Sequence, residues 1–162
     1  LTLAIAVIIA LCVNRFVLVN AEIPSGSMEN TIMTGDRVFG NRLAYIFGEP
    51  KRFDIIIFRY PDDEKQLFIK RIIGLPGETV EIHDGQIFID GSKTPLKDVT
   101  TKEFMQGSFG PYTVPDNCYF VMGDNRNNSK DSRYWEHTFV TDDEIVGKAF
   151  LRYWPLNKIK FL

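Results

Sequence analysis

Apolar residues occur in short runs that are separated by turn-forming residues, a pattern typical of β structure. Continuous apolar runs at residues 54–58 and 67–73 predict two buried strands, and Gly74-Leu75-Pro76-Gly77 ends the second. A third run, residues 118–122, predicts another strand. We therefore expect a mainly β fold.

A different pattern extends over residues 78–115, where Gly, Lys, Thr and Pro recur. The runs Val80-Glu81-Ile82 and Ile87-Phe88-Ile89 lie on either side of His83-Asp84-Gly85-Gln86, which predicts a hairpin with alternating faces. No candidate catalytic residue lies in this stretch. We expect residues 78–115 to form a small β insertion.

The N-terminal stretch is the most apolar part of the chain. Residues 1–13 are apolar except for Thr2, and apolar character resumes after Asn14-Arg15 through Val19. Thirteen residues are short for a bilayer, which needs about 20 at helical rise. Because the chain begins at Leu1 without a methionine or a basic flank, we expect a fragment that starts inside a transmembrane helix. A buried core helix and a cleavable signal peptide are the alternatives.

Two polar residues in apolar surroundings are the first candidates for chemistry. Ser27 lies in a Pro-Ser-Gly-Ser turn after the N-terminal stretch, and Lys70 lies within residues 67–73. A serine nucleophile needs a base, and a lysine can act as that base when burial lowers the pKa of its amine. Arg71 would have the same effect, but strand alternation places it on the opposite face from Lys70. Burial must therefore contribute most to lowering the pKa of the Lys70 amine.

Both residues also have ordinary structural explanations. Serine in such a turn usually satisfies local backbone groups, and lysine in an apolar strand usually extends its ammonium group to water. A third segment favours chemistry, because residues 123–133 contain two serines, two acids and two arginines directly after a predicted strand. Polar loops at strand ends often carry function.

Five motifs follow one another along the chain: Pro24-Ser25-Gly26-Ser27-Met28, Gly35-Asp36-Arg37-Val38, Lys51-Arg52-Phe53-Asp54-Ile55, Lys70-Arg71-Ile72-Ile73-Gly74-Leu75-Pro76-Gly77-Glu78, and residues 123–133. In this order the chain resembles the bacterial type I signal peptidases, membrane-anchored Ser/Lys proteases that remove signal peptides from exported proteins. The resemblance implies antiparallel coiled sheets in a catalytic domain of residues 20–77 and 116–162. It also implies that residues 78–115 are the insertion and residues 1–19 a truncated transmembrane anchor.

The resemblance also implies roles for single residues. Ser27 would be the nucleophile and Lys70 the general base, while the Ser27 backbone N–H and the Ser25 hydroxyl would form the oxyanion hole. Ser129 would hydrogen-bond the lysine amine and orient it. Four charged residues would support the loop, because acids and arginines crowded in a short segment usually pair. These residues are Asp124, Arg126, Asp131 and Arg133.

Substrates of this family present small residues, typically Ala-X-Ala, before the cleaved bond. The resemblance implies an extended substrate that pairs with strand edges near Ser25 and Lys70. It also implies shallow apolar pockets, although ordinary core packing is the alternative for each wall residue. The pocket-wall residues are Ile23, Met28, Ile32, Phe68 and Ile69. The expected partners are preprotein signal peptides at the export machinery and the lipid bilayer, with the N-terminus cytoplasmic and the catalytic domain outside.

Composition excludes several other classes. The 162 residues carry a formal net charge of -2 with a pI near 5.7, which provides no basic surface for nucleic acid. Cys12 and Cys118 lie in the anchor and in a predicted strand, so a disulfide between them is implausible. His83 and His137 have no Cys or His at ligand spacing, and we expect neither a metal nor a cofactor.

Two alternatives remain. After Trp135 the chain reads Glu136-His137-Thr138 where many family members continue into Gly-Phe-Val, so His137 could replace Lys70 as the base, with Asp131 as its acid. The second alternative is a membrane-tethered β domain that binds exported polypeptides without cleaving them.

Overall fold

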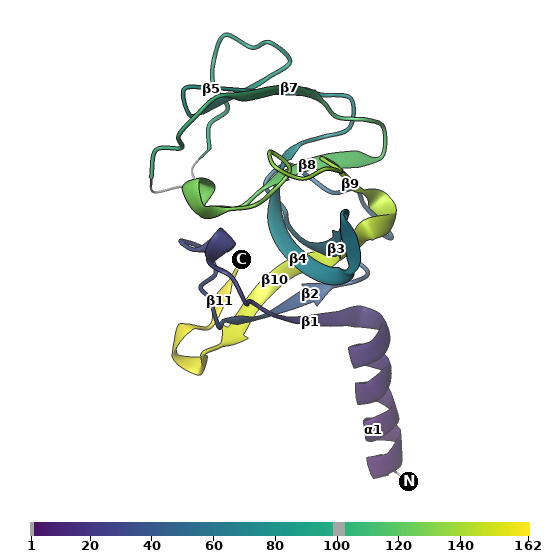
Figure 1. Ribbon diagram of the computed structural model, residues 1–162. Helices are drawn as coiled ribbons and strands as arrows, with labels where there is room; N and C mark the ends of the chain where they lie inside the picture. The colour runs from purple at the N-terminus through teal and green to yellow at the C-terminus, as the bar shows by residue number, and fades with distance from the viewer. Residues whose placement is uncertain (1, 99–102) are drawn as a thin grey trace.

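A coiled antiparallel sheet is the main element of the computed structural model, which describes residues 2–98 and 103–162 (Figure 1). In this part of the chain the strand order is β1-β2-β10-β3-β4-β8-β9, and β11 pairs with β10. The antiparallel pairings confirm the mainly β prediction. The strands are β1 Leu18–Glu22, β2 Arg37–Asn41, β3 Ile55–Tyr60, β4 Asp63–Gly74, β8 Cys118–Met122, β9 Val140–Thr141, β10 Ile145–Trp154 and β11 Lys160–Phe161. Short 3-10 helices join them at η2 Gly26–Met28, η3 Arg126–Asn128, η4 Asp142–Glu144 and η5 Leu156–Lys158.

The β3–β4 hairpin contains both apolar runs predicted as strands. Ile56 pairs with Lys70, and Phe58 pairs with Phe68. On its other side β4 pairs with β8 only from Arg71 to Gly74. Within the described chain, residues 66–70 therefore have no strand partner at this edge of β4.

Both faces of the main sheet are covered, which explains why β3 is continuously apolar from Ile55 to Phe58 instead of alternating. Ile55 and Ile57 join one core cluster, together with Val19, Val38 and Ile69. The other face holds a second cluster that is rich in aromatic side chains. Its members are Ile56, Phe58, Tyr60, Ile72, Tyr119, Val121, Trp135 and Val140.

The predicted insertion forms a separate sheet with the order β6-β5-β7. Its strands are β5 Thr79–His83, β6 Gln86–Ile89 and β7 Phe109–Thr113. The predicted hairpin is confirmed, and its turn residues Asp84 and Gly85 have φ of 48° and 75°, as a two-residue turn between twisted strands requires. This sheet shares a core with β8, since Val80 and Ile82 cluster with Phe120 and Met122.

The N-terminal stretch forms helix α1 (Thr2–Cys12), a π-helical turn (Val13–Val17) and then β1. No helix in residues 2–98 or 103–162 combines the length and the apolar character that a bilayer-spanning helix needs. The range predicted for the anchor, 1–19, also overlaps the sheet, because Val19 pairs with Gly40 and is only 3% exposed. The last apolar residue of that run faces the protein core.

Candidate functional site

Ser27 and Lys70, 43 residues apart, meet at the unpaired edge of β4. Ser27 lies in η2, directly after the chain leaves β1. The Ser27 Oγ and Lys70 Nζ atoms are 2.7 Å apart, and the two residues are 8% and 3% exposed. The structure thus brings the predicted nucleophile and the predicted base into direct contact.

The surroundings of Lys70 disfavour its charged form. Two contacts oppose this, because its Nζ donates to the Ile69 carbonyl at 3.1 Å and lies 5.3 Å from the centre of the Phe68 ring, and both favour the ammonium form. Burial lowers the pKa of the Lys70 amine from 10.5 to about 8, although the charges of Asp131 and Asp124 act in the opposite direction. About one tenth of the amine is therefore neutral at pH 7, and about half at pH 8.

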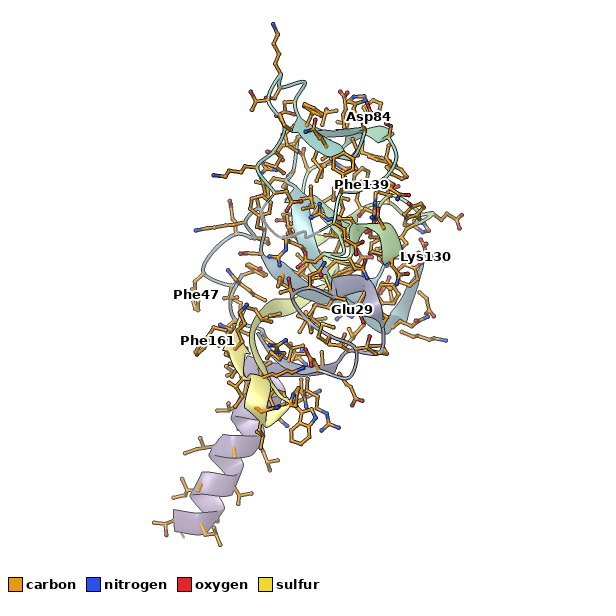
Figure 2. All side chains as sticks on the ribbon, turned by 90° about the vertical axis from the view of Figure 1, so that its left-hand side faces the viewer. Glu29, Phe47, Asp84, Lys130, Phe139 and Phe161 are labelled. Carbon is orange, nitrogen blue, oxygen red and sulfur yellow. The ribbon has the colours of Figure 1, made fainter. Side chains whose placement is uncertain are left out.

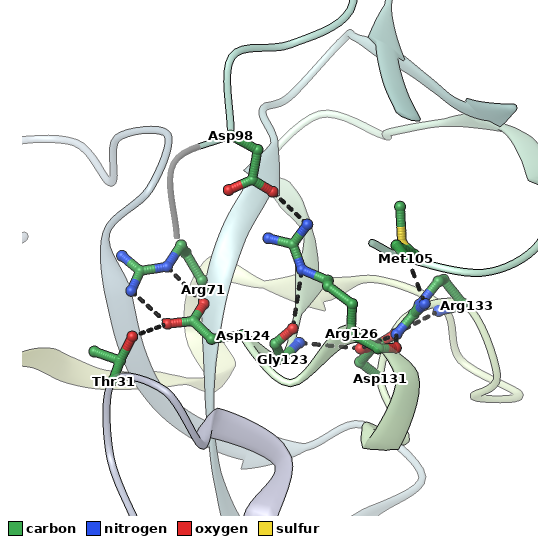
Figure 3. A network of polar contacts seen from close by, with 9 residues as sticks. All are labelled: Thr31, Arg71, Asp98, Met105, Gly123, Asp124, Arg126, Asp131 and Arg133. Atoms are coloured by element: carbon green, nitrogen blue, oxygen red, sulfur yellow. Dashed lines mark hydrogen bonds and ion pairs between the residues drawn. The ribbon is translucent and has the colours of Figure 1, made fainter. Parts of the chain in front are cut away.

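Asp124 is held by residues outside its own loop. The Arg71 guanidinium donates to its two carboxylate oxygens at 2.7 and 2.6 Å, and the Thr31 hydroxyl donates at 2.5 Å (Figure 3). We expected the four loop charges to pair with each other, which is wrong for Asp124. Strand alternation turns Arg71 away from Lys70 and toward this carboxylate.

The remaining loop charges divide into one local and one distant pair. Asp131 and Arg133 pair within the loop at 2.8 and 2.9 Å, and Asp131 also accepts the Gly123 N–H at 3.0 Å. Arg126 instead pairs with Asp98, which belongs to the predicted insertion (Figure 3). Of the four charged residues predicted to pair within the loop, only Asp131 and Arg133 do so.

The other two predicted serines lie close to the pair without bonding Lys70. The Ser25 Oγ is 3.4 Å from the Ser27 Oγ. The Ser129 hydroxyl is buried and has no hydrogen-bond partner among the described residues, so its predicted contact with the lysine amine is not made here. Ser129 is nevertheless adjacent to the nucleophile's segment, because a Cβ added to Gly123 would lie 2.2 Å from its Oγ and 2.3 Å from the Ser27 carbonyl oxygen.

Asn125 is a site residue that the sequence reasoning missed. Its backbone N–H donates to the Ser27 carbonyl at 3.0 Å, and its side-chain amide donates to the Gly26 carbonyl at 3.0 Å. These two bonds hold the turn that carries Ser27, the predicted nucleophile. The Gly-Asp-Asn sequence after an apolar strand was the available signal, but nothing in it indicates which distant segment the amide reaches.

A groove of about 600 Å³ opens beside Ser27 and Lys70. It lies between residues 20–26 and residues 66–69, and Ile23, Phe68 and Ile69 line it as predicted. Met28 and Ile32 do not, because they are completely buried in the core cluster of Ile55 and Ile57. Ile57, Asn128 and Lys130 line the groove without having been predicted.

His137 is not part of this site. Its Nδ1 lies 2.9 Å from an Asp62 carboxylate oxygen, and its side chain is 68% exposed. Asp131, the acid that a histidine-based mechanism would use, is bonded to Arg133 and Gly123 instead. In the described part of the chain, no group of three His, Cys, Asp or Glu side chains is placed to hold a metal ion.

Comparison with known proteins identifies the family. A family model described as signal peptidase, peptidase S26, matches residues 1–154. The chain belongs to this family. It is 38% identical to a probable signal peptidase I-2 of Synechocystis sp., covering 99% of this chain and 74% of that protein. Signal peptidase I T of Bacillus subtilis is 37% identical, covering 98% and 85%.

A solved structure agrees with this assignment. The crystal structure of a signal peptidase I from Enterococcus faecalis is 37% identical, with a TM-score of 0.53, and the match covers 62% of this chain and 96% of that one. The resemblance to type I signal peptidases is thereby confirmed, and membership of the signal peptidase family makes the chain a peptidase.

Gly123→Ala tests whether the close packing of Gly123 against Ser27 and Ser129 is needed for activity. The added methyl group would meet the Ser27 carbonyl oxygen and the Ser129 side chain, so Ser27 must move relative to Lys70. We expect kcat/KM for peptide cleavage to fall by about 100-fold, the cost of misplacing a reacting group by about 1 Å. Gly48→Ala is the control, because its Cβ meets nothing closer than 3.7 Å. Equal activity of the two variants would show that the packing around Gly123 does not position Ser27.

Proposed function

We propose that this chain is a type I signal peptidase that cleaves exported preproteins through Ser27 as nucleophile and Lys70 as general base. The observation that carries the proposal is the buried 2.7 Å contact between the Ser27 Oγ and the Lys70 Nζ at the wall of a groove. A lysine whose pKa is lowered to about 8 by burial can act as a base near neutral pH.

In the proposed reaction the neutral Lys70 amine takes the Ser27 proton while the Oγ atom attacks the carbonyl carbon of the scissile bond. The resulting ammonium gives that proton to the leaving amine as the C–N bond breaks, which leaves an ester on Ser27. A water molecule then attacks the ester, with Lys70 again accepting the proton. The ester bond breaks and Ser27 regains its hydroxyl.

Ser25 and Ser129 complete the proposed machinery. The Ser27 backbone N–H and the Ser25 hydroxyl would donate to the oxyanion, and the 3.4 Å between the two serine hydroxyls supports this. A buried hydroxyl without a partner is unusual in a native protein and often has a functional reason. The Ser129 hydroxyl fits such a reason if it orients the lysine amine once substrate is bound.

The groove supports an extended substrate. Residues 66–70 of β4 have no strand partner at this edge among the described residues, and the segment before Ser27 forms the opposite wall. A bound peptide can add as a strand between them, with alternate side chains pointing into the groove. Apolar walls from Ile23, Phe68 and Ile69 suit small side chains, which supports cleavage after Ala-X-Ala.

We also propose that α1 belongs to a single membrane anchor, with the catalytic domain on the extracytoplasmic face. The described side chains of α1 are all exposed, and α1 projects away from the body (Figure 1). The Arg42 N–H donates to the Val17 carbonyl at 2.8 Å, which ties the loop carrying Phe47 to the end of this helical segment. Phe47 and Phe161 are 92% and 75% exposed and lie toward the α1 end, whereas Asp84 lies at the far end (Figure 2).

Cleavage of a preprotein with an Ala-X-Ala site, followed by mass spectrometry of the products, tests the activity. We expect cutting after the second alanine, a loss of at least about 1,000-fold in Lys70→Met because no base remains, and near-normal cutting in His137→Ala. Cutting by Lys70→Met but not by His137→Ala would establish the histidine mechanism. Binding of the preprotein without cutting would favour the non-enzymatic domain.

The pH dependence follows from the pKa of Lys70. Only the neutral amine can accept the Ser27 proton, so kcat/KM should rise with pH, reach half its plateau near pH 8 and level off above it. Initial rates on one peptide across pH 6 to 10 measure this. A profile that stays flat down to pH 6 would rule out Lys70 as the base.

Flotation of the intact chain with phospholipid vesicles tests the anchor. The chain should float with the vesicles, and placing two charges in α1, Ile8→Lys with Leu11→Lys, should release it because each charge in a bilayer costs about 3 kcal/mol. Lysines at Gln86 and Ser92, in the insertion, are the matched control. Release by the control pair, or flotation of the α1 variant, would contradict the proposal.

A further inference from the structure

The insertion contacts the loop of residues 123–133 through charged side chains. Asp98 of the insertion pairs with the Arg126 guanidinium, and the side chains are 10% and 3% exposed (Figure 3). Arg126 also donates from its Nε to the Gly123 carbonyl at 3.0 Å. A buried ion pair thus links the insertion to the first residue of the loop.

Asn127 makes a second link, this time to the insertion backbone. Its Nδ2 donates to the Phe104 carbonyl at 3.0 Å, and its Oδ1 accepts the Gln106 N–H at 2.9 Å. The residue between them, Met105, is 4% exposed, and its sulfur lies 3.5 Å from an Arg133 nitrogen (Figure 3). The Asn127 side chain therefore bonds the backbone on both sides of Met105, a buried residue of the insertion.

The 103–107 segment is supported from its other side by the β5–β6 hairpin. The Gly85 N–H donates to the Gly107 carbonyl at 3.0 Å. A Cβ at Gly85 would lie 1.8 Å from the Met105 carbonyl oxygen, so the hairpin turn is pressed directly against the segment. The 103–107 segment is thus held between the hairpin and the 123–133 loop.

On its inner side the same loop holds the catalytic pair. Asn125 bonds the backbone of Ser27 and Gly26, and Asn128 and Lys130 line the groove beside Lys70. We propose that Asn127 is a positioning residue through which the insertion presses the 123–133 loop onto Ser27 and Lys70. This proposal rests on the proposed peptidase mechanism and adds to it a structural role for the insertion.

Loss of the Asn127 contacts should raise the pKa of the Lys70 amine. If the loop loosens, water reaches the lysine amine, and the solvation that burial removed is restored. The amine then stays protonated to higher pH, and the rate midpoint moves upward. A residue that contributes only to stability would lower the melting temperature without moving this midpoint.

The test compares Asn127→Ala, Asn127→Asp and Ser92→Ala with the unaltered chain. Aspartate can still accept from the Gln106 N–H but cannot donate to the Phe104 carbonyl. Ser92 is the matched control, because its side chain also makes two hydrogen bonds, both to the Thr94 backbone within the insertion. In Asn127→Ala we expect kcat to fall by about tenfold, less than the roughly 100-fold cost of a 1 Å misplacement, with KM unchanged and the rate midpoint raised. Asn127→Asp should lose at least as much activity as Asn127→Ala, because its carboxylate would face the Phe104 carbonyl oxygen, and Ser92→Ala should match the unaltered chain.

Amide hydrogen exchange keeps the proposal testable apart from the activity. The Asn125 N–H, which bonds the Ser27 carbonyl, should exchange faster in Asn127→Ala than in Ser92→Ala. Unchanged exchange with unchanged kcat and midpoint, even at a lower melting temperature, would overturn the positioning role. Failure of the proposed function is distinct, since the unaltered chain would then show no Lys70-dependent cleavage while the exchange difference remained measurable.

Discussion

The Lys70 amine has to stay out of water while remaining within hydrogen-bonding distance of Ser27, and much of the structure serves these two requirements. Lys70 lies in strand β4, where it is only 3% exposed and its Nζ is 5.3 Å from the centre of the Phe68 ring. Ser27 lies in a short 3-10 helix, and its carbonyl accepts a hydrogen bond from the Asn125 N–H. Because the two residues come from distant segments, their 2.7 Å contact depends on the 123–133 loop that joins them.

Two carboxylates near Lys70, those of Asp131 and Asp124, favour its charged form. Asp124 is paired with Arg71 and Asp131 with Arg133, each in a buried contact. Burial outweighs the carboxylates, and the pKa of the amine falls to about 8. The loop carboxylates therefore fix the loop through their arginine partners, while burial keeps the lysine able to lose its proton.

Sequence patterns predicted the strands of the β3–β4 hairpin and the Asp84-Gly85 turn, because periodicity and turn residues act locally. The Ser27–Lys70 pairing came instead from the base that a serine nucleophile needs and from the family resemblance. Sequence patterns failed where side chains cross between distant segments. Nothing local indicates that Asp124 selects Arg71, or that Arg126 selects Asp98 of the insertion. Met28 and Ile32 were misplaced because one apolar side chain suits a core and a pocket wall equally well. The unpartnered Ser129 hydroxyl likewise follows from packing, which no motif encodes.

Direct titration of the Lys70 amine tests whether burial beside Ser27 lowers its pKa enough to make it a base. Lysine labelled with ¹³C and ¹⁵N allows NMR of each ammonium group across pH, and the Lys70 signal is the one lost in Lys70→Met. We expect a midpoint near 8 for the Lys70 signal in the intact chain. A midpoint at the ordinary value of 10.5 would show that the buried contact with Ser27 does not produce a neutral base, and the mechanism would be wrong.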